Sequence, residues 1–379
     1  MPTSKADSVY QSIRALIADM NPHDRLPNFN DMRSELRVSA VTLDRALGMA
    51  EEHGLVVRQQ GKGIFVAPHV RLKTVGIYMG IDPFGANHSP VWRGITDQLR
   101  DCCAADEFET HLFLDPPTTA PVNVVRQQLT NEFAAGRLQG VIYLCGTGPE
   151  QFDWLMGLKI PMVAHHPNRQ SHTASVVLDE PALIRMGVQS LAEQGCKRIG
   201  LLSHFCVEDA KQSAGKLEQF QAALAEHGLV YDPAWSAHCV RTRAQWNAPN
   251  AQSYKELGYD AVFNLLSPLP AKSPARPDGL LSLDDMLTSG AMAALNRLDI
   301  RPGVDLAVAT LANKDSSSLL GYEHQLTFLE YDPAETARTM HAMLMELIAG
   351  RKLASNIAYI EPLARTPIRS ETASSVEAG

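Results

Sequence analysis

Residues 24–66 read DRLPNFNDMRSELRVSAVTLDRALGMAEEHGLVVRQQGKGIFV. Asn28 and Ser39 each stand directly before a short amphipathic pattern. Both are residue types that cap helix N-termini, so two helices are expected here. Gly54 follows the second pattern, at a position where a left-handed residue commonly ends a helix. The apolar stretches LVVRQ and IFV on either side of QGKG then predict a β-hairpin.

Another helix is expected before this stretch. Apolar residues recur there at helical spacing, at Val9, Ile13, Leu16 and Ile17. The two prolines of NPHDRLP end that pattern, because proline disrupts a helix interior. Three helices followed by a hairpin predict a winged helix-turn-helix at the N-terminal end of the chain.

The glycines of QGKG allow three interpretations. A phosphate-binding loop is excluded, because no helix beginning with Lys-Ser or Lys-Thr follows them. A plain hairpin turn remains open. The third interpretation is the wing of a DNA-binding domain, in which Gly61 and Gly63 permit a tight turn and Lys62 contacts a phosphate or the minor groove.

The same stretch resembles the N-terminal domain of GntR-type regulators. The matching pieces are DRLP, the VS-x-x-T that opens the third helix, RAL within it, HGL at its end and GKGIFV in the wing. In such a domain the third helix lies in the major groove. The resemblance implies DNA contacts from the following residues: Asn28, Asn30, Ser39, Ala40, Thr42, Arg45, Gly61, Lys62 and Gly63.

Three positions depart from the family pattern. The family usually carries arginine where this chain has Ala40 and Asn30, and it often has a basic residue where this chain has Asp44. A bidentate hydrogen bond to a base is worth about 1–3 kcal/mol, and each missing arginine removes one. We therefore expect an operator that differs from the family's usual one, and binding that depends on dimerisation.

Composition narrows the class of protein. The chain has 379 residues, 45% of them hydrophobic, and a formal net charge of −8. Residues 1–68 contain eight basic and eight acidic residues, so the whole negative charge belongs to the remainder. The six cysteines form no metal-binding spacing, and no apolar run is long enough to cross a membrane. These features predict a cytoplasmic protein with reduced thiols, without cofactor or metal.

Residues 70–365 alternate between apolar strands and amphipathic helices, which predicts an α/β fold of doubly wound parallel sheets, two rather than one. The pieces TVGIYMG, LQGVIYL, IPMVAHHP, SVVLDEPALIRMGVQSLAEQGCKRIGLL and LTFLEYDPAETARTMHAML resemble the two-lobed effector domain of LacI/GalR regulators. That domain is similar to periplasmic sugar-binding proteins. We therefore expect a DNA-binding domain at 1–69, an effector-binding and dimerisation domain at 70–365 and a polar tail at 366–379.

The resemblance implies a ligand between the two lobes, at the carboxyl ends of the strands. The implied contacts are Phe84, Trp92, His166, Asp179 in VVLDE, Lys216 in KLEQF and Asp285 in LDDM. Lys216 stands where the family has arginine, so an ammonium group replaces a planar guanidinium that can form two parallel hydrogen bonds. Asp179 and Asp285 could instead be helix caps, and Trp92 could be a core residue. A metal site at His165 and His166 is not expected, because no third ligand is spaced to join them.

Together these features predict a homodimeric, ligand-responsive transcription regulator, with repression favoured. Its affinity for a palindromic operator would change when a small, sugar-like effector binds. An alternative is a domain that senses a non-sugar ligand or a protein partner. A cytoplasmic solute-binding protein is a further alternative, which the winged head opposes. An enzyme fused to such a head would need a longer chain and a cofactor lysine, so no catalytic activity is expected.

Overall fold

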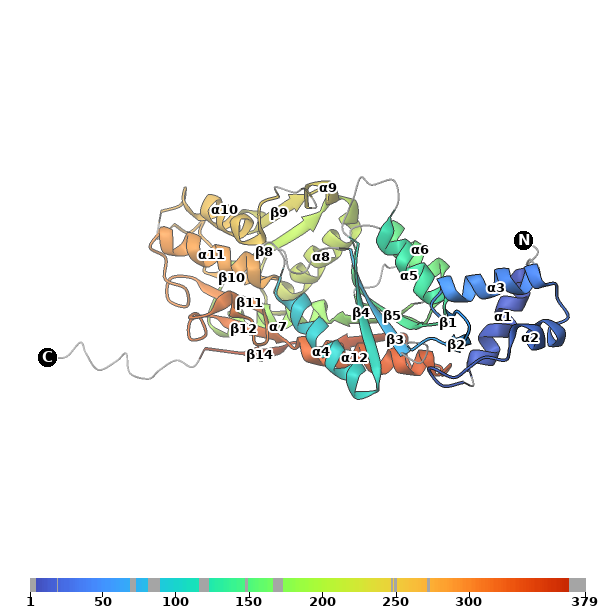
Figure 1. The fold of residues 1–379 in the computed structure, drawn as a ribbon. Coiled ribbons are helices and arrows are strands. Elements are labelled where there is room, and N and C mark those ends of the chain that lie inside the picture. The colour runs from blue at the N-terminus through green and yellow to red at the C-terminus, as the bar shows by residue number, and fades with distance from the viewer. Residues whose placement is uncertain are drawn as a thin grey trace.

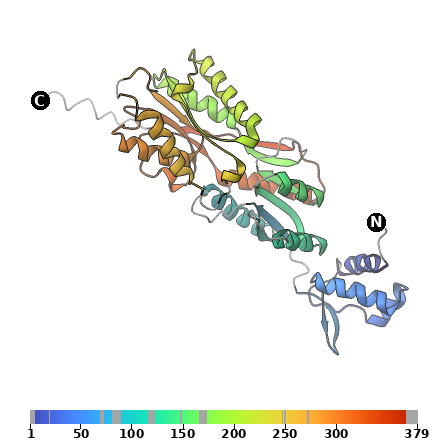
Figure 2. The ribbon, with the colours of Figure 1, turned by 90° about the horizontal axis from the view of Figure 1, so that it is seen from above.

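The computed structural model describes residues 5–18, 20–68, 73–80, 89–115, 123–146, 149–165, 173–246, 248, 251–270 and 273–367. They form a small helical head followed by a body of two α/β lobes (Figure 1). The head lies at one end of an elongated molecule. The lobe that contains most of the C-terminal half of the chain lies at the other end (Figures 1 and 2).

The head has the predicted winged helix-turn-helix. Its elements are α1 (Lys5–Ala18), α2 (Phe29–Glu35), α3 (Ala40–Glu52), β1 (Val56–Gln59) and β2 (Gly63–Val66). The two strands pair antiparallel, and Arg25 forms an additional bridge with Phe65. Ile13, Leu43 and Leu47 are fully buried among other apolar residues of the three helices. The apolar faces read from the sequence therefore meet in one core, except that Leu16 was wrongly assigned to it and is 40% exposed.

The predicted caps of the head are confirmed. The side chain of Asn28 accepts a hydrogen bond from the Asp31 amide, and that of Ser39 accepts one from the Thr42 amide. Gly54 follows α3 with φ of 65°, the left-handed conformation expected there. Apolar Val41 does not join the core: it remains 79% exposed in the first turn of α3.

The first lobe is built on a sheet in the order β13-β7-β6-β5-β3-β4. Its strands are β3 (Lys73–Met79), β4 (Phe108–Leu114), β5 (Leu138–Cys145), β6 (Met162–His165), β7 (Ala174–Leu178) and β13 (Ile357–Ile360), all paired parallel. One face packs against α4 (Val91–Ala105) and α12 (Pro333–Ile348). The other packs against α5 (Val124–Ala134) and α6 (Pro149–Gly157). Adjacent residues of a strand, such as Ile77 and Tyr78, enter opposite cores, as the alternation of a strand requires.

The second lobe has a sheet in the order β14-β12-β11-β10-β8-β9. Its strands are β8 (Ile199–Cys206), β9 (Ala237–Arg241), β10 (Gly279–Ser282), β11 (Ala307–Asn313), β12 (Thr327–Tyr331) and β14 (Leu363–Arg365), the last antiparallel to β12. One face is covered by α7 (Glu180–Glu193) and α8 (Ala210–Glu226), the other by α10 (Tyr254–Leu266) and α11 (Asp285–Arg297). A short helix, α9 (Arg243–Trp246), follows β9.

Two mainly parallel sheets confirm the predicted fold class. The chain passes between the lobes from β7 to α7, from β12 to α12 and from β13 to β14. The sequence pattern did not indicate α6, β13 or β14. The two strands are only four and three residues long and most of their residues are exposed, so they are too short to show the alternation that identifies a half-buried strand. From residue 368 on, the predicted polar tail lies outside the described residues.

The head contacts the first lobe. The Tyr10 hydroxyl donates to the Ala134 carbonyl over 3.2 Å, and the Arg137 guanidinium donates to the His53 carbonyl. Arg137 also pairs with Glu132 over 2.7 Å. These contacts lie at the C-terminal end of α3. At 1.5 Å per residue, the N-terminal end of α3 lies about 20 Å further along the helix.

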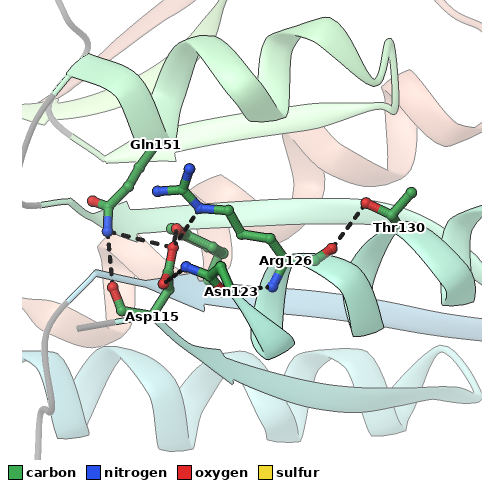
Figure 3. Close-up of polar contacts among 6 residues, drawn as sticks. Asp115, Asn123, Arg126, Thr130 and Gln151 are labelled. Atoms are coloured by element: carbon green, nitrogen blue, oxygen red, sulfur yellow. Dashed lines mark hydrogen bonds and ion pairs between the residues drawn. The ribbon is translucent and has the colours of Figure 1, made fainter. Parts of the chain in front are cut away.

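A buried polar network fixes the carboxyl ends of β3 and β4 in the first lobe (Figure 3). Asp115 is 2% exposed and accepts hydrogen bonds from the Tyr78 hydroxyl, the Asn123 amide and Arg126 Nε at 2.9 Å. Gln151 donates to the Asp115 carbonyl over 2.8 Å. The buried oxygens of Asp115 thus all have hydrogen-bond donors, so the network holds the ends of these two strands in place.

Candidate functional site

The N-terminal end of α3 presents an exposed surface. Ala40, Val41 and Arg45 point away from the core, and Thr42 is half-buried. The first amides of a helix carry partial positive charge, which favours an anion such as a phosphate. Val41 offers a bare apolar tip, the type of group that contacts the thymine methyl in the major groove. Sequence analysis did not single out Val41, because its apolar character suggested burial.

The wing turn has the geometry that its glycines suggested. Gly61 and Gly63 have φ of 71° and 121°, in the region that favours glycine, and the Lys62 side chain is exposed. Arg25 lies against the same turn, since a Cβ at Gly63 would sit 2.8 Å from its Nε. Arg25 is therefore a candidate backbone contact that sequence analysis missed. Its position within DRLP, one of the matching pieces, was the available signal.

Asp44, the acidic residue that seemed out of place on α3, is paired. Its carboxylate lies 2.8 Å from the guanidinium of Arg58 on β1, which also approaches Glu51 at 3.2 Å. Arg58 therefore holds the wing against α3. The positive charge of Arg58 thus offsets the negative charges of Asp44 and Glu51, and Arg58 is not free to contact DNA.

The remaining head residues named from the sequence lie at the starts of α2 and α3. Asn28 and Ser39 serve as helix caps, while Asn30 is exposed in the first turn of α2. The Ser39 and Thr42 hydroxyls lie 2.8 Å apart. Because both oxygens already have a partner, these two residues have less capacity for base contacts than Arg45. All the DNA contacts remain predictions.

The body contains a cavity of about 410 Å³ between the two lobes. The first lobe contributes the start of α4 and the ends of β6 and β7. The second lobe contributes the ends of β8, β10, β11 and β12, together with α8, α9 and the starts of α7, α10 and α11. The lining residues are Ser89, Val91, Trp92, His165, Leu178, Glu180, His204, Gln212, Lys216, Trp246, Tyr254, Leu283, Asp284, Asp285, Met286, Leu311, Asn313 and Tyr331. The carboxyl ends of strands therefore surround it, as predicted.

Three predicted ligand contacts, Trp92, Lys216 and Asp285, line this cavity. Asp179 is not among the lining residues; its side chain accepts from the Ala182 amide over 2.9 Å as the N-cap of α7. Phe84 and His166 lie outside the described residues. Each contact with a ligand remains a prediction.

Two adjacent carboxylates lie at the start of α11. Asp284 is the N-cap and accepts from the Leu287 amide over 2.8 Å, so the cap that sequence analysis considered for Asp285 belongs to its neighbour. Asp285 is 2% exposed and accepts from the Ser316 hydroxyl over 3.4 Å. Burial, followed by repulsion from Asp285, raises the pKa of Asp284 to about 7. Burial also raises the pKa of Asp285. Asp284 was not predicted as a site residue, although it stands beside Asp285 in the LDDM motif.

Aromatic rings from both lobes form much of the remaining wall. Trp246 and Tyr254 stack with ring centroids 5.0 Å apart, and His204 meets both edge-on. On the opposite lobe, Trp92 meets His165 edge-on at 5.4 Å. Trp92 also packs against the core of its lobe, as its alternative interpretation expected, while its contact with a ligand stays a prediction. These rings offer flat apolar surfaces on which a ligand ring can stack.

Lys216 of α8 forms an ion pair with Glu180 at the start of α7, with 2.6 Å between Nζ and the carboxylate. The Lys216 side chain is only 14% exposed. Its charge is thus largely committed to Glu180.

Neither a metal site nor a membrane span emerges from the described residues. They contain no group of three or more His, Cys, Asp or Glu side chains placed to hold a metal ion. No helix within the same ranges is long and apolar enough to cross a membrane.

Comparison with protein families matches two parts of the chain. Residues 5–66 match the model of bacterial regulatory proteins of the gntR family, and residues 188–365 match a periplasmic binding protein-like domain. Over 72 residues the chain is 33% identical to the histidine utilization repressor of Klebsiella aerogenes. The chain spans only 30% of that repressor.

Solved structures share the fold. A complex of the transcriptional regulator CelR with cellobiose is 18% identical, with a TM-score of 0.59, over 87% of this chain and 91% of that one. A regulatory protein of the LacI family from Chloroflexus aggregans is 19% identical, with a TM-score of 0.61, over 77% of this chain and 96% of that one. CcpA of Lactococcus lactis is 14% identical, with a TM-score of 0.59, over 78% and 98%.

Proposed function

We propose that this chain, which joins a GntR-type winged-helix domain to a periplasmic binding protein-like domain, is a transcription regulator controlled by a small effector. The observation that carries this proposal is the cavity lined by both lobes, on the same chain as a DNA-binding head. A ligand that contacts both walls stabilises one arrangement of the lobes over others, and that difference in affinity can shift DNA binding.

In this proposal residues 1–69 bind operator DNA, and residues 70–365 bind the effector and dimerise. Arg45 and Val41 reach base edges, while Lys62 and Arg25 contact the backbone. A homodimer places two heads on a two-fold operator, and ligand-dependent movement of the lobes changes the spacing of the heads. Repression is favoured because the K. aerogenes relative is a repressor.

The proposed effector is a small, hydroxyl-bearing molecule. Trp92 and Trp246 provide stacking surfaces, and the carboxylate of Asp285 accepts hydrogen bonds from ligand hydroxyls. CelR, a structural neighbour, is seen in complex with cellobiose, which supports a carbohydrate-derived ligand. A non-sugar ligand remains the alternative.

The test measures operator binding by fluorescence anisotropy, with and without each of a panel of sugars and sugar derivatives. The operator is first selected from random duplexes with the full-length protein. At least one compound should change operator affinity tenfold or more, and Trp92→Ala should abolish the change while keeping basal DNA affinity. Trp235→Ala, which does not line the cavity, is the matched control. If the compounds that bind the cavity leave operator affinity unchanged, the proposed function is wrong.

A further inference from the structure

The charged side chains lining the cavity are unbalanced. Among the described lining residues, Glu180, Asp284 and Asp285 are acidic and Lys216 alone is a lysine or arginine. Lys216 is committed to Glu180 over 2.6 Å. The two aspartates are therefore left with little cationic compensation from the protein.

Apart from a minor effect of the Lys216 charge on Asp284, the other contacts of the aspartates are neutral. Asp284 accepts from the backbone amide of Leu287, and Asp285 accepts from the side chains of Ser316, Ser318 and Asn313. A further cation of this lobe, Arg241, lies over the Trp246 ring at 5.5 Å and donates to Gln252, outside the cavity lining. Two adjacent buried carboxylates repel each other and have lost hydration, so a cation in the cavity would relieve both costs.

The aromatic walls favour the same class of ligand. Trp92, Trp246, Tyr254 and Tyr331 all line the cavity that the aspartates enter. The face of an indole or phenol ring carries partial negative charge, and it attracts ammonium or guanidinium groups within about 6 Å of its centroid. Carboxylates and ring faces in one cavity thus both select positive charge.

We propose that the effector carries a protonated amino or guanidino group, in addition to hydroxyl groups, and that this group binds Asp284 and Asp285. This inference rests on the proposed function, because it assumes that the cavity is the effector site. Lys216 neutralises Glu180 and keeps that third acid from competing for the ligand cation. Ligand hydroxyls bind the remaining polar groups, among them Gln212.

The titration of Asp284 supports this assignment. Its pKa of about 7 means that part of the ligand-free protein holds a proton there at neutral pH. A bound ammonium favours the ionised form, so binding displaces that proton. Affinity for ethanolamine, whose amine stays protonated over this range, should therefore rise as pH increases from 6 to 8. The titratable groups that line the cavity together with Asp284 are Asp285 on α11, Lys216 on α8, Glu180 on α7, His204 on β8, His165 on β6, Tyr254 on α10 and Tyr331 on β12.

The test compares matched probes on the full-length protein. Glucosamine is paired with glucose, and ethanolamine with ethylene glycol; binding is followed by tryptophan fluorescence and calorimetry. Each amine should bind at least tenfold more tightly than its neutral partner. Asp284→Asn and Asp285→Asn should remove that preference. Asp284→Asn keeps the helix cap, since asparagine caps as well as aspartate.

The control variant is Asp232→Asn, which changes an aspartate cap outside the cavity and should leave the preference intact. If the wild-type protein binds no amine more tightly than the two cavity variants do, the proposal is overturned. The result is distinguishable from failure of the proposed function. Neutral sugars that bind and change operator affinity would refute the cationic effector and retain the regulator. Amines that bind the cavity without changing operator affinity would support the cationic ligand and refute the regulator.

Discussion

Replacing Lys62 by alanine tests whether the wing contacts the DNA backbone. The side chain is exposed at the turn between β1 and β2, and no ion pair is found for it within the described residues. Its removal should therefore change the free energy of unfolding by less than about 0.5 kcal/mol. The turn itself depends on Gly61 and Gly63, which stay in place.

The expected effect on DNA binding follows from counterion release. Each lysine–phosphate contact contributes about 0.9 to the slope of log affinity against log salt concentration, so two heads lose about 1.8. Between 50 and 200 mM salt, the ratio of wild-type to variant affinity should then fall by a factor of about 12. Because a phosphate contact carries no sequence information, the selected operator and a scrambled duplex should be affected alike.

The assay is fluorescence anisotropy with the full-length protein on both duplexes at several salt concentrations. Lys352→Ala, at an exposed position of the body, is the matched control and should leave the slope unchanged. An unchanged slope for Lys62→Ala would refute the backbone contact. A loss confined to the selected operator would show instead that the wing reads bases.

Three further predictions concern the head and the lobes. Arg45→Ala should weaken the free energy of operator binding by about 1–3 kcal/mol per half-site and relax the base preference at one operator position. Repeating the duplex selection with the variant measures that preference, and an unaltered sequence profile would contradict base reading by α3. Asp115→Asn should lower the free energy of unfolding in urea by about 1–3 kcal/mol, because it leaves the 27%-exposed Arg126 without its charged partner; no loss would contradict that role. Burial alone would raise the pKa of Asp115, but hydrogen bonds from Tyr78 and its other donors hold it below the usual value, so this stability is present above the unfolded pKa and is lost as pH falls through the folded pKa. Asp179→Ala should cost about 0.5–2 kcal/mol of stability and Asp179→Asn much less, since asparagine preserves the cap; loss of the effector response in Asp179→Asn at unchanged stability would instead support the ligand contact predicted from the sequence.

The head was readable from the sequence because its determinants are local. Caps at Asn28 and Ser39, the left-handed Gly54 and the glycines of the wing act within a few residues of themselves, and each occupies its expected place. The alternation of strands and helices in the body was equally predictable, because the spacing of apolar residues follows the buried face of each element. Short edge strands such as β13 and β14 were missed, because three or four residues that are mostly exposed are too few to show a strand pattern.

The candidate cavity was only partly predictable. The LDDM motif pointed to Asp285 and the KLEQF motif to Lys216, and both line the cavity. The same kind of signal, an acid between a strand and a helix, also pointed to Asp179, which the structure uses as a cap outside the cavity lining. A single acid before a helix fits either role, and only the position of its neighbours separates the two.

The sequence by itself therefore determined the class of each domain, the positions of the helices in the head and the approximate positions of the cavity walls. The tertiary structure alone brought Asp284 beside rings from both lobes, committed Lys216 to Glu180 and neutralised Asp44 through Arg58. The physical reason is distance along the chain. Local patterns report burial within one element, whereas the charge balance of a cavity depends on strand ends far apart in sequence that meet only when the lobes are packed.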